Sequence, residues 1–202
     1  MTNKDCRFIS LAVASVALPP GREGTLPAAT QLAAIAMLIA ERDTSGAWDF
    51  TLEHRAVAAG DGEDRLLAWA VTVMPEDGIV LGWQLAERIV PPLLEAATAG
   101  DPEIGRAFLQ RLTRLVTAPS VDLAARHGGV GAPPLEAIAA TQDIELQPVS
   151  AAEIQTAWSF GDRRLLRRHV AAEAAAVWRL WLAEANGAAP DASAAFDAWR
   201  GR

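Results

Sequence analysis

The chain has a single cysteine, Cys6, among its 202 residues. One cysteine excludes an intramolecular disulfide framework and any zinc cluster built on cysteine, and it is typical of a reducing cytoplasm. No apolar stretch reaches the roughly eighteen residues that span a bilayer, so we expect no membrane segment. The three histidines lack the spacing of a zinc site, and Walker, GxGxxG and GxSxG motifs are absent. From these absences we expect a cytoplasmic protein that lacks a cofactor-binding motif.

Basic residues are too few to balance the acidic ones. The chain has 18 Lys and Arg against 25 Asp and Glu, for a net charge of −7. A protein that coats nucleic acid needs a basic surface for its phosphate contacts, so the charge argues against this class, whereas a local basic groove is compatible with the composition. With 51% hydrophobic residues, the chain is long enough for one sizeable core.

The first third of the sequence has strand patterns. Apolar, β-compatible residues over 7–18 predict a strand that ends at Pro19-Pro20, which cannot extend a central strand. The triplet Thr44-Ser45-Gly46 is of hairpin length and separates two more apolar arms. Together these segments predict three antiparallel strands, although the Ala-rich arm before the triplet also suits a helix.

Helical and strand patterns alternate in the remainder. Apolar periodicity predicts helices over 63–74, 86–99 and 102–116, and short buried strands over 79–83 and 120–125. A strand reached through a helix normally lies parallel to an earlier strand, so the sheet continues as a parallel one. Pro91-Pro92 either lie in the first turn of the second helix or kink it.

The C-terminal third is predicted to be helical, with Ser150 as a helix cap and a break at Phe160-Gly161. Asn186-Gly187 ends the long helix. We therefore expect one domain over 1–186 and a tail over 187–202 that carries a short helix.

Three segments carry a resemblance to a known family. They are LAVAS at 11–15, QLAERIVPPL at 84–93, and the pair His169-Val170 in the last long helix. In this order they resemble the Asp-x-Glu strand, the Asn-Gly-x-x-Phe-Asp-x-Pro-x-Leu motif and the Asp-Val pair of a bacterial family of predicted 3'-5' exonucleases, related to the proofreading domain of family B DNA polymerases. The resemblance runs over about 7–182. It implies an α/β, ribonuclease-H-like fold with a mixed sheet of three antiparallel strands, then parallel strands, flanked by helices.

The resemblance also implies a two-metal site, which this chain does not furnish. Enzymes of this DEDD class hold two metal ions with four carboxylates, and Mg²⁺ requires such oxygen ligands. At the four matching positions this chain has Ala12, Ala14, Ile89 and His169. We therefore expect a pseudoenzyme without exonuclease activity or a bound cofactor, retained to bind single-stranded nucleic acid or a protein partner.

Two alternatives stay open. An active exonuclease would bind Mg²⁺ or Mn²⁺ through relocated ligands, for which Asp122, Asp162 and Glu173 are the candidates, although capping or surface roles suit these acids as well. The other alternative is a structural homodimer or subunit without a nucleic-acid role.

One dense basic cluster consists of Arg163, Arg164, Arg167 and Arg168. It suits a phosphate backbone that passes beside the vacated site, with Trp83 or Trp158 stacking on a base and Gln84 at the former motif. The other interpretation is a solvated helix face whose arginines pair with nearby acids.

Overall fold

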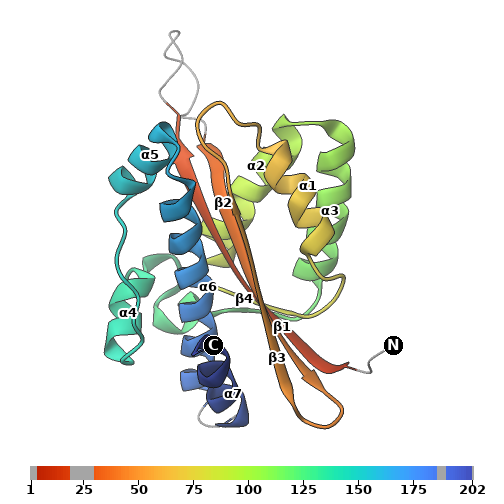
Figure 1. Cartoon of the computed structure of the whole chain (residues 1–202), viewed down its shortest axis with the longest axis vertical. Coiled ribbons are helices and arrows are strands. Elements are labelled where there is room, and N and C mark those ends of the chain that lie inside the picture. The colour runs from red at the N-terminus through yellow and green to blue at the C-terminus, as the bar shows by residue number, and fades with distance from the viewer. Residues whose placement is uncertain (1–3, 19–29, 186–189, 202) are drawn as a thin grey trace.

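The sheet at the centre of the molecule has five strands in the order β3-β2-β1-β4-β5 (Figure 1). The structure is a computed structural model that describes residues 4–18, 30–185 and 190–201. The strands are β1 (Lys4–Ala17), β2 (Thr30–Asp43), β3 (Trp48–Ala56), β4 (Ile79–Gly82) and β5 (Ser120–Asp122). The first three are antiparallel neighbours, whereas β4 and β5 run parallel to β1. The predicted α/β class with a ribonuclease-H-like mixed sheet is therefore confirmed.

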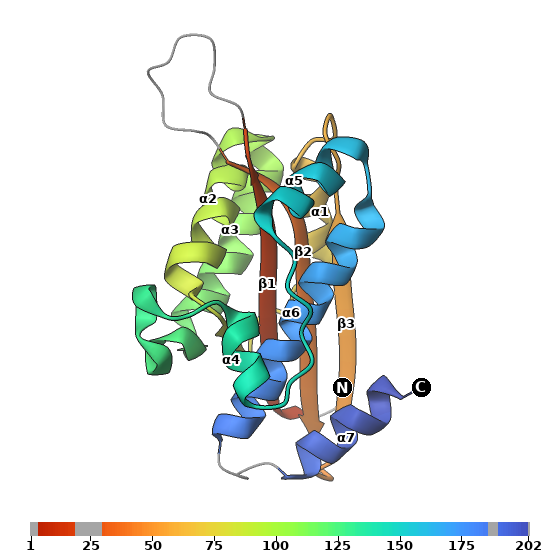
Figure 2. The same cartoon turned by 90° about the vertical axis from the view of Figure 1, so that its left-hand side faces the viewer.

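Helices cover both faces of the sheet (Figures 1 and 2). One face carries α1 (Asp64–Val73), α2 (Val90–Ala99) and α3 (Pro102–Thr117). The other carries α4 (Leu135–Thr141), α5 (Ala151–Phe160), α6 (Arg163–Glu184) and α7 (Pro190–Arg200). Short turns complete the described chain: the π-helix η1 (Leu85–Ile89) and the 3-10 helices η2 (Leu123–His127) and η3 (Gly129–Gly131).

Alternating side chains of β1 belong to two different cores. Ile9 and Leu11 pack with α1, α2 and α3, whereas Ala12 and Ala14 lie in the core beneath α6. The residues that pair with these two alanines on β2 are alanines as well, and α6 contributes three more that are buried. Because the side chains are small on both sides, the backbone of α6 can approach the sheet closely.

Helix α7 belongs to this second core. Its Phe196 is 1% exposed and lies with its ring centroid 5.2 Å from that of Phe50 on β3. The predicted short C-terminal helix therefore packs on the sheet as the other helices do. The predicted boundary at 186/187, the helix end at Asn186-Gly187 and the strand end at Pro19-Pro20 lie outside the described residues.

The segment expected as one helix over 86–99 consists of two pieces. The π-helix η1 comes first, and Pro91 and Pro92 occupy the first turn of α2. Proline is favourable there because the first helical N–H groups have no intrahelical partner.

In the part of the chain that the structure describes, none of the helices combines the length and apolar character that crossing a bilayer requires.

Candidate functional site

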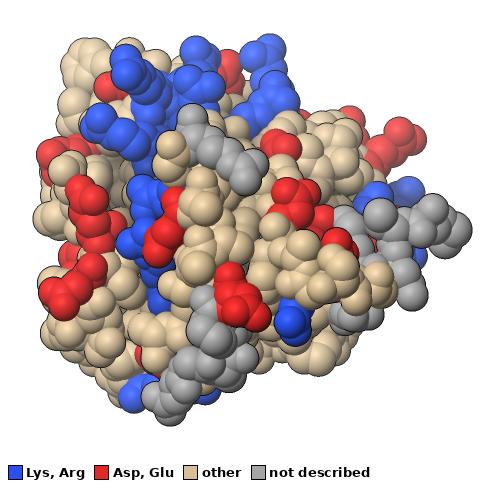
Figure 3. Space-filling model, turned by 60° about the horizontal axis from the view of Figure 1, so that its bottom comes forward, with Lys and Arg blue, Asp and Glu red and all other residues tan. Residues whose placement is uncertain are grey.

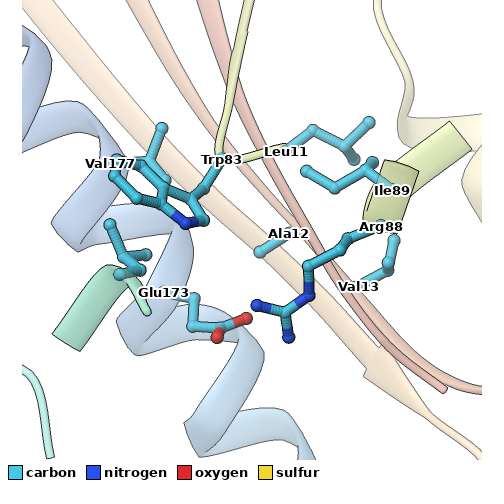
Figure 4. Close-up of a pocket in the computed structure, with 9 residues that line it drawn as sticks. Leu11, Ala12, Val13, Trp83, Arg88, Ile89, Glu173 and Val177 are labelled. Carbon is cyan, nitrogen blue, oxygen red and sulfur yellow. The ribbon is translucent and has the colours of Figure 1, made fainter. Parts of the chain in front are cut away.

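Three of the four positions at which the resemblance implies metal ligands border two adjoining spaces. Ala12 of β1 and Ile89 of η1 line the same small cavity, together with Trp83, Arg88 and Glu173 (Figure 4). His169 lies one turn before Glu173 on α6, with His169 Nε2 3.8 Å from Glu173 Oε1. Residues 77 positions apart in the sequence, Ala12 and Ile89, are thus brought together by the parallel pairing of β1 with β4. Ala14 is buried in the core beneath α6.

This cavity is narrow. Its volume is about 20 Å³, which suffices for one water molecule. The methyl group of Ala12 and the side chain of Ile89 present only carbon to it, whereas Mg²⁺ requires several oxygen ligands. Among residues 4–18, 30–185 and 190–201, no three His, Cys, Asp or Glu side chains are grouped so as to hold a metal ion. The residues present therefore do not fit the two-metal site that the resemblance implies.

Arg88 lines the small cavity beside Glu173, where a metal site would need additional carboxylates. The guanidinium group of Arg88 points toward the carboxylate of Glu173 (Figure 4). Burial raises the pKa of Glu173 to about 7; the positive charge of Arg88 opposes this rise and the negative charge of Glu136 adds to it. Burial also lowers the pKa of His169, and Arg88 lowers it further, against the effect of Glu136. Near neutral pH the site therefore combines a fixed cation with two groups that burial drives toward their neutral forms.

The local backbone explains how Arg88 and Ile89 reach this site. Gln84 has the left-handed conformation, with φ 55° and ψ 54°, which is uncommon for a residue other than glycine. Its backbone N–H donates to Asp122 Oδ1 at 2.9 Å, and that of Leu85 donates to Asp122 Oδ2 at 3.0 Å. Non-glycine residues in the left-handed conformation, such as Gln84, are often found at functional sites, and so are π-helices such as η1.

The side chain of Gln84 makes hydrogen bonds within the protein. Its side-chain Nε2 donates to the carbonyl oxygens of Gly129 and Val130, each at 3.3 Å, so the amide ties η1 to η3. The prediction of Gln84 as a nucleic-acid contact therefore finds its amide already engaged.

A wider cleft of about 360 Å³ adjoins the narrow cavity. Arg88 and Glu173 line both spaces, and the cleft is bordered further by His169, by Glu136 of α4 and by the connection from α4 to α5. His169 Nδ1 and the indole N–H of Trp83 are buried and have no hydrogen-bond partner within the described residues. These two buried polar atoms therefore remain unsatisfied within the described part of the chain.

The three candidate relocated ligands do not share a site. Asp122 accepts backbone N–H groups from Gln84, Leu85 and Ala124 and so acts as a cap. Asp162 caps α6 by accepting from the N–H of Leu165 at 3.0 Å. It precedes Glu173 by eleven residues, which is about 16 Å along a helix. A single metal ion cannot contact both, so the geometry provides no support for the relocated-ligand alternative.

The basic cluster lies on another side of α6. Arg164, Arg167 and Arg168 line a groove of about 510 Å³ that is bordered by β3 and α7, and this groove shares no residue with the cleft around His169 and Glu173. At 3.6 residues per turn, these arginines and His169 point in different directions. The expectation that the cluster borders the vacated positions is therefore wrong.

The arginines of this cluster differ in their partners. Arg163 makes an ion pair with Asp61, with Nη2 2.6 Å from Oδ2. Within the described residues, the guanidinium groups of Arg164, Arg167 and Arg168 have no carboxylate within 4.0 Å. In Figure 3 the basic side chains gather densely in one area, whereas the acidic ones are dispersed. The interpretation as a face neutralised by nearby acids thus holds for Arg163 alone.

The tryptophans proposed to stack on a base are not accessible for it. Trp83 is 4% and Trp158 is 8% exposed, so neither ring has a free face. Sequence reasoning missed two aromatic side chains that are accessible: Phe160, which is 86% exposed at the end of α5, and Trp199, which is partly exposed in the arginine groove. The position of Phe160 at a helix break was the only signal of its exposure.

Sequence comparisons add nothing to these observations, because the chain matches no protein-family model and no curated protein sequence. The exonuclease family remains a prediction from the resemblance.

Proposed function

We propose that this protein is a non-catalytic ribonuclease-H-like module that binds nucleic acid without cleaving it. One observation carries the first half of the proposal: the cavity lined by Ala12 and Ile89 has room for only about one water molecule and is lined by Arg88 and a single carboxylate, Glu173. The arginine groove on α6 supports the second half.

Electrostatics explains why the site is unsuited to two-metal hydrolysis. Such hydrolysis needs cations that activate a water and neutralise charge in the transition state. The guanidinium of Arg88 repels a divalent cation, and among the described residues that line the small cavity Glu173 alone has a carboxylate. With a pKa of about 7, Glu173 is also partly protonated at neutral pH and is a weak ligand.

The predicted location in the cytoplasm rests on the scarcity of cysteine.

The test is incubation of the purified protein with labelled single-stranded DNA or RNA in the presence of Mg²⁺ or Mn²⁺. We expect bound but intact oligonucleotide in a gel and in a fluorescence anisotropy assay. Turnover that disappears in Glu173→Gln, and persists in the control Glu103→Gln on α3, would overturn the non-catalytic function. Turnover that persists in both variants would indicate a contaminating nuclease, which a second purification scheme removes.

A further inference from the structure

The arginine groove runs between three elements that are distant in sequence. Arg164, Arg167 and Arg168 of α6 form one wall, Leu52 and His54 of β3 another, and α7 closes the groove with Trp199 and Arg200. The groove opens on the side of α6 away from the vacated positions, so it is a separate surface from the cleft around Glu173.

The charge in this groove is not balanced by neighbouring acids. Three guanidinium groups on two successive turns of α6 repel one another, and no described carboxylate lies within 4.0 Å of them. The chain as a whole carries a net charge of −7, so this local excess of positive charge contrasts with the remainder of the surface. Uncompensated guanidinium groups are suited to an external anion, because each can form a bidentate hydrogen-bonded pair with a phosphate.

The spacing and the lining favour a polymer over a single anion. Arg164 and Arg168 are four residues apart, about 6 Å along the helix axis, so they can contact successive phosphates of one strand. Leu52 and the partly exposed ring of Trp199 add apolar surface between the charges. Grooves that track a single strand combine a basic lining with aromatic rings on which bases stack. A duplex has its bases already stacked and would leave this apolar surface unused.

From these features we infer that the groove between α6, β3 and α7 holds the backbone of a single-stranded nucleic acid, with a base stacked on Trp199. The inference rests on the proposed nucleic-acid-binding function and assigns it to a different side of α6 from the vacated site.

The test compares two variants of equal charge. The groove variant is Arg164→Gln/Arg167→Gln/Arg168→Gln, and the control is Arg65→Gln/Arg106→Gln/Arg114→Gln, which removes three exposed arginines from α1 and α3. Fluorescence anisotropy measures binding of labelled oligonucleotides of about twelve nucleotides, as single strand and as duplex, between about 50 and 200 mM salt. Circular dichroism confirms that both variants are folded.

We expect the groove variant to bind the single strand at least roughly tenfold more weakly and to flatten the slope of log affinity against log salt by about two, since each single-strand phosphate contact contributes about 0.7. The control should stay within about twofold of the wild type. Trp199→Leu, which keeps an apolar side chain in place, should weaken binding of the single strand by roughly tenfold or less through lost stacking.

Three results would overturn the inference. If both triple variants lose affinity equally, or if the duplex binds as tightly as the single strand, the groove is not a single-strand path, although the protein still binds nucleic acid. If the wild type is a dimer that the groove variant converts to monomer, the groove is an interface between two copies. Absence of any binding at low salt would instead refute the proposed function itself.

Discussion

The pH dependence of stability should reveal the buried carboxyl group of Glu173. Its pKa of about 7 in the folded protein compares with an ordinary value of 4.5. Because the folded state holds the proton more tightly than the unfolded state, stability is lost as the pH rises from about 4.5 through 7. The gap between the two pKa values corresponds to about 3 kcal/mol at pH values well above 7.

Replacement of Glu173 by glutamine removes this penalty and keeps the shape of the side chain. At pH 5 the variant should be more stable than the wild type by only about 1 kcal/mol or less. At pH 8.5 Glu173→Gln should be more stable by up to about 3 kcal/mol, which in a domain of this size raises Tm by roughly 6–12 °C. Urea unfolding and thermal melts between these pH values measure the difference directly.

The control is Glu103→Gln, since Glu103 is exposed on α3 and its replacement should leave the pH profile unchanged. Comparison of each variant with the wild type also cancels His169, whose lowered pKa acts in the opposite sense and reduces stability as the pH falls below 6.5. If Glu173→Gln and the wild type have parallel profiles between pH 5 and 8.5, Glu173 is not buried as described and the reasoning is refuted.

Two further predictions concern the same structure. Arg88→Gln removes the positive charge that lowers the pKa of Glu173, so the loss of stability should move to higher pH in the same series of melts; an unchanged midpoint would show that the two side chains do not interact. Gly105→Ala would place a methyl group against the carbonyl oxygen of Ala97, where α3 packs closely on α2, and should cost roughly 1–3 kcal/mol in urea unfolding. Gly62→Ala, with no atom within 4 Å of the added carbon, serves as its control and should be nearly neutral; equal losses would contradict the close packing of the two helices.

The structure alone shows which side chains surround Ala12 and Ile89. Arg88 lies in the segment 84–93 that carries the resemblance, yet its side chain is remote in sequence from Glu173. Their juxtaposition depends on η1, whose start is fixed by the left-handed Gln84 and by Asp122, 38 positions away. No local pattern encodes contacts over such separations, so the position of Arg88 beside Glu173 was not predictable from the sequence.

Some features were available from the sequence but were not extracted from it. His169 and Arg168 are neighbours in the chain, and the 100° step between adjacent helical residues already separates the directions of their side chains. The expectation that the basic cluster lies beside the vacated site ignored this periodicity. The burial of Trp83 and Trp158 is different, because it depends on which helix covers each ring.

The sequence by itself determined the order of the main strands and helices, because apolar periodicity, turn residues and caps act over a few neighbouring residues. The hairpin at Thr44-Ser45-Gly46 and the cap at Ser150 are examples, and the latter forms a complete capping box with Glu153. The single cysteine rules out an intramolecular disulfide through composition alone, which does not depend on how the chain folds. Only the tertiary structure decided which side chains face one another. Burial, the small volume of the cavity beside Ala12 and the shape of the arginine groove all arise from packing between segments that are far apart in the chain.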